Sequence, residues 1–237
     1  MQIALLRIGI DSGSGGIQGP LFQDGTFEYI PIPDYSKKDE RTYGNVTGRH
    51  GRKLVEYFPE SRRAGMMNQP IHFDPEFVTF TYGDPTGPKA GLRRLQKGDM
   101  LVFYCGLEGW GFNSPPALYL MGYFEVSDAG IATDFSENEV ETLFGENFHV
   151  RHRGTYEKQK RSLILVKGSS KSCLLKKAFC ISETGYDKAG RPLKVLSKEM
   201  QKIFGDFDGK ISIQRSPTRW VKAEYIEKAA AFVRSLK

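Results

Sequence analysis

Two apolar runs with a polar loop between them dominate the hydrophobic pattern of this chain. The first, residues 100–104, follows the turn sequence Lys97-Gly98-Asp99, and the second, residues 117–126, returns after a loop rich in Gly, Asn, Ser and Pro. Runs of this length that contain Val, Phe and Tyr are typical of strands, and the scarcity of polar residues indicates burial on both faces. The pattern predicts a buried β-hairpin at the centre of a small closed sheet.

Shorter apolar segments predict the other elements. Strands are expected at residues 2–10, in a hairpin over 21–34 that turns at 23–25, at 71–73 and 77–82, and at 162–167 and 172–181. Helices are expected at 52–58, at 196–204 with Ser197 as N-cap and Gly205 as terminator, and at 218–236, where apolar side chains recur every three or four positions. The predicted fold is a single α+β domain over residues 1–237: β-rich, with a mixed or antiparallel barrel core and flanking C-terminal helices.

The composition narrows the class of protein. A hydrophobic content of 39% and a charged content of 26% are those of a soluble globular chain. No apolar run approaches the roughly 20 residues that cross a bilayer, so we expect no membrane partner. The start of the chain lacks a basic leader, and the three cysteines lack metal-ligand spacing. A cytoplasmic protein with reduced cysteines is therefore expected.

Charge is distributed unevenly along the chain. Residues 149–177 carry nine Lys or Arg and one acid, whereas residues 128–146 carry six acids and no Lys or Arg. This polarity favours a basic face that holds a phosphate backbone, while the alternative is a pair of solvated loops. The candidate nucleic-acid-binding residues are Arg151, Arg153, Lys158, Lys160 and Arg161.

A glycine-rich loop, residues 11–16, follows the first predicted strand. It lacks the ending of a P-loop, the glycine spacing of a dinucleotide site and the pattern of a serine hydrolase. Arg7 interrupts an apolar strand, which is costly unless the charge is paired or faces a pocket, and Asp11 lies four residues on. We predict a site for an anion or a nucleobase edge; the alternative is a glycine turn fastened by an Arg7–Asp11 bridge. The residues are Arg7, Asp11, Ser12, Ser14, Gly15 and Gly16.

His72 and Asp74 form a second candidate site. Residues two apart on an extended chain point to one side, so the imidazole and the carboxylate can share a ligand. With His149 or His152 as a third donor, the set would match the two-histidine, one-carboxylate triad of non-haem iron enzymes. The alternative is an Asp-Pro turn capped by a nearby histidine.

Aromatic residues in the loop of the predicted central hairpin form a third candidate. Trp110 and Phe112 are predicted to be exposed, where they could stack on a nucleobase beside the basic segment. Tyr104 and Tyr123 are predicted to be core residues. The alternative is that the loop aromatics cover the end of the barrel.

Several motifs resemble one family. They are RIGIDSGSGGIQGPLFQDGTFEYIPIPD (residues 7–34), Tyr43, the HFDP step at residues 72–75, and the GDMLVFYCGL and LYLMGYFEV strands. Together they are similar to the third type of nucleotide modification associated domain, although Ile8 and the cysteine-containing strand end depart from its pattern. The resemblance implies a role in DNA base hypermodification, with DNA favoured over RNA as partner, and it adds Asp34 and Tyr43 to the candidate ligand-binding residues. The Gly-Asp hairpin also resembles PUA-like barrels, which include readers of modified bases.

Three functional hypotheses follow from these residues. The leading one is a nucleic-acid-associated domain that binds or processes a nucleotide or modified base. The alternative is a metal-dependent enzyme that acts on a small molecule or base through His72, Asp74 and a further histidine. The third is a partner subunit whose basic face meets an acidic protein. The candidate catalytic residues are Asp11, His72 and Asp74. These residues do not identify a cofactor, and they fit a protein that only binds a modified base as well as an enzyme that processes one.

Overall fold

A computed structural model of the chain describes residues 1–214 and 217–237. The strands of the described residues are β1 (Ile3–Arg7), β2 (Gly19–Leu21), β3 (Ile32–Pro33), β4 (Ile71–His72), β5 (Thr81–Asp84), β6 (Met100–Gly109), β7 (Ala117–Ile131), β8 (Ile164–Gly168), β9 (Cys173–Cys180), β10 (Ser182–Tyr186), β11 (Pro192–Leu196) and β12 (Arg219–Trp220). The α-helices are α1 (Glu60–Met66), α2 (Glu137–Phe144), α3 (Phe148–Arg151), α4 (Arg153–Gln159), α5 (Lys198–Phe204) and α6 (Ile226–Ser235). Short 3₁₀ helices cover Leu54–Tyr57, Gly87–Arg94, Ala132–Asp134 and Ala223–Tyr225.

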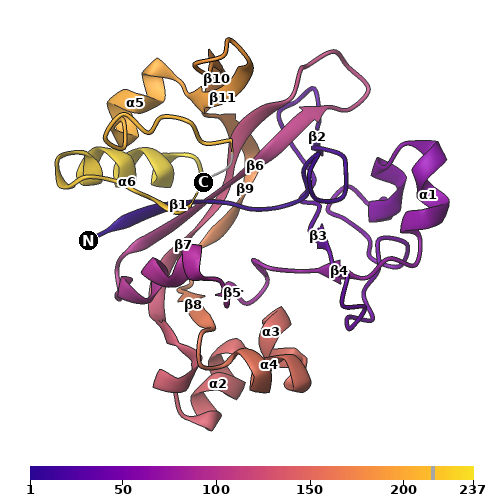
Figure 1. The fold of residues 1–237 in the computed structure, drawn as a ribbon, viewed down its shortest axis with the longest axis vertical. Coiled ribbons are helices and arrows are strands. Elements are labelled where there is room, and N and C mark those ends of the chain that lie inside the picture. The colour runs from indigo at the N-terminus through magenta and orange to yellow at the C-terminus, as the bar shows by residue number, and fades with distance from the viewer. Residues whose placement is uncertain (215–216) are drawn as a thin grey trace.

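The predicted central hairpin is confirmed. Strands β6 and β7 pair antiparallel from Met100 opposite Glu125 to Leu107 opposite Ala117, with a register shift after Phe103. The first eight residues of β6 are buried, as an apolar run without alternation predicts. Figure 1 shows the two strands crossing the middle of the molecule.

Each strand of the hairpin carries two partners on its outer edge. Strands β1 and β2 pair in parallel with successive parts of β6, and β8 and β9 pair antiparallel with successive parts of β7. Strand β12 then pairs with β1, and β5 with β8. The result is one large mixed sheet of eight strands.

This sheet does not close into the predicted PUA-like barrel. Closure requires the two edge strands to share a ladder of hydrogen bonds. In the described part of the chain, β12 pairs with β1 and β5 pairs with β8, and neither edge pairs with the other. The apolar hairpin indicated a buried sheet centre correctly, but it carried no information on where the edges of the sheet would lie.

The C-terminal helices are confirmed, with one change of boundary. Helix α5 begins after Ser197, whose hydroxyl accepts from the amide of Met200, and ends before Gly205, as expected. The helix predicted from residue 218 instead begins at Ile226. Residues Arg219–Trp220 are drawn into a strand because their backbone pairs with β1, and this tertiary pairing outweighs the helical periodicity.

Other segments also differ from the predictions. The turn at residues 23–25 is present, but the segment after it contacts β2 by a single bridge, Leu21 with Phe27, and β3 pairs with β4 instead. Helices α2, α3 and α4 were not predicted. Figure 1 shows them together at one end of the sheet, below β8. Ser136 caps α2 by accepting from the amide of Glu139.

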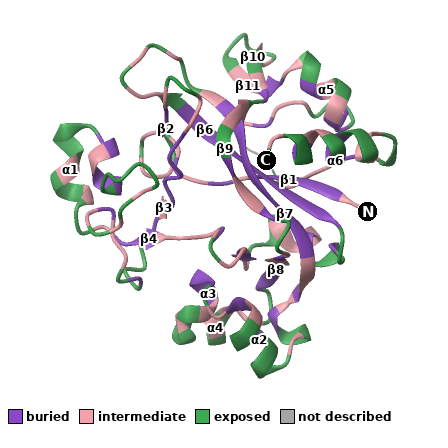
Figure 2. Cartoon of the chain, turned by 180° about the vertical axis from the view of Figure 1, so that it is seen from behind, coloured by how far each residue is buried: buried purple, intermediate pink, exposed green. Residues whose placement is uncertain are grey.

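The largest core covers both faces of the sheet: the C-terminal helices pack on one face, and the rings of Phe77, Phe103 and Phe124 pack together on the other. Buried residues concentrate on β1, β6 and β7, while the outer faces of the helices are exposed (Figure 2). At the centre, the ring of Phe124 lies 4.7 Å from that of Phe103 and 5.5 Å from that of Phe77. Edge-to-face packing of this kind adds to the hydrophobic stabilisation of the hairpin.

Replacing Phe124 with Ala should lower the free energy of unfolding by about 3–5 kcal/mol, because it removes a fully buried ring and leaves a cavity. Urea denaturation followed by circular dichroism measures the change. Tyr35→Ala is the control, since this side chain is 74% exposed, and it should change stability by less than about 0.5 kcal/mol. Equal losses for both variants would contradict a core centred on the hairpin.

Candidate metal and nucleotide site

Three side chains from distant parts of the chain converge near one end of the sheet. His72 ends β4, Asp74 follows two residues later, and His149 comes from α3. His149 Nε2 lies 3.6 Å and His72 Nε2 lies 4.0 Å from Asp74 Oδ2. One donor atom from each residue falls within 4.8 Å of the others. Of the two histidines that the sequence offered as a third donor, the structure brings His149 to this cluster.

Asp74 is held in place by donors from two other elements. The amide of Gly83 in β5 donates to both carboxylate oxygens, at 3.1 and 2.9 Å, and the Asn147 side chain donates to Oδ2 at 3.3 Å. The Asp74 side chain is only 3% exposed. These contacts fix the orientation of the carboxylate, so that Oδ2 faces both imidazoles.

The two imidazoles are oriented by different contacts. His149 Nδ1 lies 2.7 Å from Gln159 Oε1 of α4. Because that oxygen only accepts, Nδ1 carries the proton and Nε2 directs its lone pair toward Asp74. The ring of His72 stacks on Phe148 at 3.9 Å, and its buried Nε2 has no hydrogen-bond partner among the described residues.

Burial governs the protonation of all three groups. Burial lowers the pKa of His72 to about 3, and the nearby His149 imidazole adds to this effect because two adjacent imidazoles do not both take up a proton. Burial also lowers the pKa of His149, although its hydrogen bond to Gln159 opposes the shift. Burial raises the pKa of Asp74 well above its ordinary range, against the effect of the Gly83 and Asn147 donors. Both imidazoles are therefore neutral at pH 7, and they supply no positive charge that would stabilise the ionised form of the Asp74 carboxylate.

This donor set fits a divalent metal ion. Two ligands of one metal, each about 2.0–2.2 Å from it, are separated by no more than about 4.4 Å. The observed spread of 4.8 Å therefore requires only small side-chain adjustments. Two neutral imidazoles and one carboxylate form the triad that leaves further coordination positions open for a substrate or water.

The glycine-rich loop lies beside this cluster and is closed by Asp11. Asp11 Oδ2 pairs with Arg7 at 3.0 Å, while Oδ1 accepts from the amides of Gly13 and Ser14 at 2.8 and 2.7 Å. The amide of Gly16 donates to the Asp11 carbonyl. The amides of Gly13, Ser14 and Gly16 are thus satisfied within the loop, and Gly15 and Gly16 supply the positive φ angles of its turn.

Arg7, Asp11 and Ser14 share a cavity with the three converging side chains. We call it the His–Asp cavity; its volume is about 570 Å³. Ser12 does not line it and faces a second cavity on the other side of the loop. The lining of the His–Asp cavity comprises Arg7, Ile8, Gly9, Asp11, Ser14, Ile32, His72, Asp74, Tyr82, Gly83, Asp84, Pro85, Thr86, Lys89, His149 and Gln159.

The candidates added by resemblance, and the aromatic loop, have other positions. Tyr43 is fully buried and donates its hydroxyl to the carbonyl of Pro31. Asp34 is buried and accepts from the amides of Ser36 and Lys38 at 2.9 Å each. Trp110 packs edge-on against Tyr57 at 5.2 Å. Trp110 and Phe112 are half-buried against apolar clusters rather than exposed as predicted, because the loop folds back onto the body.

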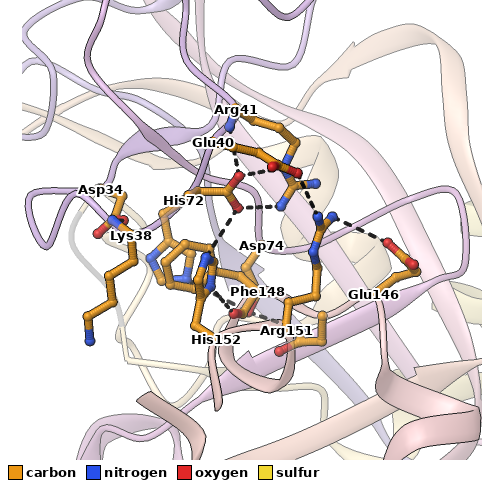
Figure 3. Close-up of polar contacts among 12 residues, drawn as sticks. Asp34, Lys38, Glu40, Arg41, His72, Asp74, Glu146, Phe148, Arg151 and His152 are labelled. Carbon is orange, nitrogen blue, oxygen red and sulfur yellow. Dashed lines mark hydrogen bonds and ion pairs between the residues drawn. The ribbon is translucent and has the colours of Figure 1, made fainter. Parts of the chain in front are cut away.

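The basic segment forms α3 and α4, directly beside the acidic α2. Arg151 bridges Glu40 and Glu146, each at 3.3 Å (Figure 3). Lys160 pairs with Glu157. The other three candidates are exposed and form no ion pair within the described residues: Arg153, Lys158 and Arg161. The acidic stretch (residues 128–146) and the basic stretch therefore lie side by side, so the basic stretch does not form a separate face. His152 lies beside Asp39, at 4.0 Å, and not beside Asp74.

Sequence reasoning missed the residues that support the site. Asn147 is the N-cap of α3, and Gln159 is the last residue of α4. Amide side chains form no recognisable motif with a histidine two or ten positions away. Only the packing of α3 and α4 against β5 makes them partners of Asp74 and His149.

The comparison with protein families decides the affiliation. The family model of nucleotide modification associated domain 3 matches residues 2–235, nearly the whole chain. The chain belongs to this family. Searches of curated proteins and of solved structures gave no match. The name of the family concerns nucleotide modification and does not distinguish DNA from RNA.

No described helix of this nucleotide modification associated domain combines the length and apolar character that crossing a bilayer would require.

Asp11→Asn should lower the free energy of unfolding by about 1–2 kcal/mol. The variant keeps an acceptor for the loop amides but leaves Arg7, whose side chain is 15% exposed, without its counter-charge. Chemical denaturation measures the loss. Glu56→Gln is the matched control, because its pair with Arg52 is far more exposed, and it should cost less than about 0.5 kcal/mol. No loss in Asp11→Asn would show that the pair does not fasten the loop.

Proposed function

We propose that this nucleotide modification associated domain binds and processes a nucleotide or modified base in the His–Asp cavity, with a divalent metal ion held by His72, Asp74 and His149. The observation that supports the metal most directly is the buried Nε2 of His72, which has no hydrogen-bond partner among the described residues and faces a buried carboxylate. The cost of burying two such groups is offset when both bind one cation.

The contacts among the three donors favour a metal over a hydrogen-bonded network. At 3.6 and 4.0 Å, the imidazole nitrogens are too far from Asp74 Oδ2 for good hydrogen bonds. Meanwhile Gln159 orients His149 from behind, in the way that outer residues orient metal-binding histidines. A divalent metal here would supply a Lewis acid that polarises a substrate oxygen or acidifies a bound water.

The rest of the cavity supports a nucleotide as the ligand. Arg7 reaches it from the end of β1 and Ser14 from the glycine-rich loop, and both belong to the most specific motif of the family resemblance. A volume of about 570 Å³ lies within the range of small-molecule and cofactor sites. The family affiliation then favours a base or nucleotide over other small polar molecules.

His72→Ala should reduce the bound metal from about one equivalent to near zero without unfolding the chain. Elemental analysis after reconstitution with iron, manganese or zinc and dialysis gives the stoichiometry, and a thermal scan reports the fold. In the parent protein the metal should raise the melting temperature, because it binds the folded state alone.

His50→Ala is the matched control for the metal experiment. His50 also lies beside a buried carboxylate, with Nδ1 3.3 Å from Glu28 Oε2, but it belongs to a different part of the fold. It should retain the full equivalent of metal. A parent protein that binds no metal, or a His72→Ala variant that retains all of it, would reject the proposed metal site.

We also propose that α3 and α4 hold the backbone of a nucleic acid at the rim of this cavity. The same helices supply His149 and Gln159 to the cavity and expose Arg153 and Lys158, and Arg161 is exposed in the turn after α4. A strand bound by these cations would therefore pass close to the site. Arg151 contributes less, because Glu40 and Glu146 already neutralise it.

If three phosphates are neutralised, the logarithm of the affinity for DNA or RNA should fall with the logarithm of the salt concentration at a slope of about −2 to −3. Replacing Arg153, Lys158 and Arg161 together with Ala should flatten this slope. Fluorescence anisotropy over a salt series measures it. The control removes three exposed lysines of the C-terminal helices instead: Lys198, Lys202 and Lys228. An identical slope in both triple variants would mean that the basic helices are only solvated.

A further inference from the structure

A second cavity lies on the other side of the glycine-rich loop. It has a volume of about 510 Å³ and is bounded by the start of β7 and by the β10–β11 hairpin, so we call it the β10–β11 cavity. Arg7 and Asp11 line both cavities, and they are the residues that the two linings share. The ion pair thus forms a common wall between them.

The two cavities differ in their chemistry. The His–Asp cavity contains three acids and two imidazoles beside its two cations, which suits a metal ion. The β10–β11 cavity contains two cations and one acid, and its other polar groups include hydroxyls and amides that can donate hydrogen bonds. Its polar lining is Arg7, Asp11, Ser12, Gln18, Thr184, Lys194 and Gln214. A surface rich in donors and net positive suits an anion.

The β10–β11 hairpin positions the second cation. Thr184 and Lys194 lie directly opposite each other in the antiparallel pair, so their side chains share one face. Lys194 Nζ lies 3.4 Å from Thr184 Oγ1, and Lys194 forms no ion pair within the described residues. The backbone amide of Lys194 donates to Gln214 Oε1. Lys194 therefore presents its charge to the cavity.

Gln18 also lines this cavity, but its carbonyl oxygen is an acceptor and does not itself recognise a phosphate. Its buried Oε1 has no hydrogen-bond partner among the described residues, although the side chain lines the cavity. A buried acceptor without a donor is costly, and a donor such as an ordered water or a sugar hydroxyl of the ligand relieves that cost, whereas a phosphate oxygen does not.

We propose that the β10–β11 cavity binds the phosphate of the nucleotide, between Arg7 and Lys194, while the base lies in the His–Asp cavity. The proposal rests on the proposed function and deepens it, because it makes the substrate a phosphorylated nucleotide rather than a free base or nucleoside. The glycine-rich loop between the cavities would then lie beneath the sugar, and Asp11 would hold Arg7 in place beside both cavities.

Isothermal titration with the four deoxynucleoside 5′-monophosphates, their nucleosides and a mixed-sequence single-stranded 12-mer tests the proposal on metal-loaded protein. At least one phosphorylated ligand should bind the parent protein more tightly than its nucleoside. Lys194→Met should weaken that binding about tenfold, because one charge-assisted contact is lost, and it should leave nucleoside binding and metal content unchanged. If Lys194→Met weakens the binding of the 12-mer alone, the cavity holds a phosphate of a nucleic-acid strand. If it weakens the binding of the monophosphates, the cavity holds the phosphate of a free nucleotide.

Lys188→Met is the matched control, because it removes the same charge from the exposed turn of the same hairpin and does not line the cavity. It should bind every ligand as the parent does. Equal binding of nucleosides and phosphorylated ligands, no binding of either class, or unchanged binding in Lys194→Met would each overturn the phosphate site. The metal content of His72→Ala is measured separately, so failure of the phosphate site leaves the test of the metal site intact.

Discussion

The antiparallel pairing of β6 with β7 is the constraint on which the rest of this structure depends. Because both strands are buried on both faces, their outer edges are the places where other strands can add. Strand β1 adds to β6 and ends at Arg7, which delivers the glycine-rich loop to one end of the sheet. Strand β8 adds to β7 and carries β5, whose Gly83 holds Asp74. Both halves of the candidate site are therefore positioned by backbone hydrogen bonds to one hairpin.

The carboxylate at the centre of the candidate site has no positively charged partner within the described part of the chain. The Asp74 side chain is only 3% exposed and accepts from Gly83 and Asn147, yet burial still raises its pKa, so these donors do not replace the water that the carboxylate lost. Two imidazoles that burial keeps neutral face the same oxygen without hydrogen-bonding to it. A cation would satisfy all three groups together, and this need for charge distinguishes the site from an ordinary buried turn.

Helices α3 and α4 connect the interior site with the surface. One turn of α3 carries His149 inward and Arg151 outward, and α4 does the same with Gln159 and Lys158. The acidic helix α2 packs beside them, so that Glu146 neutralises part of the positive charge. As a result, the surface around the cavity is less basic than the local sequence indicates.

The sequence alone determined the parts of this protein that depend on local pattern. The apolar runs of residues 100–104 and 117–126 predicted the central hairpin, Ser197 and Gly205 predicted the limits of α5, and the two-residue spacing placed His72 and Asp74 on one side. Tertiary structure decided the rest, because it depends on contacts between distant segments. Those contacts selected His149 over His152, drew Arg219–Trp220 into the sheet, left the sheet open, and buried Tyr43 fully and Trp110 partly. Local spacing has a physical meaning within one strand or helix turn, whereas the partner of a buried carboxylate is chosen by how separate elements pack.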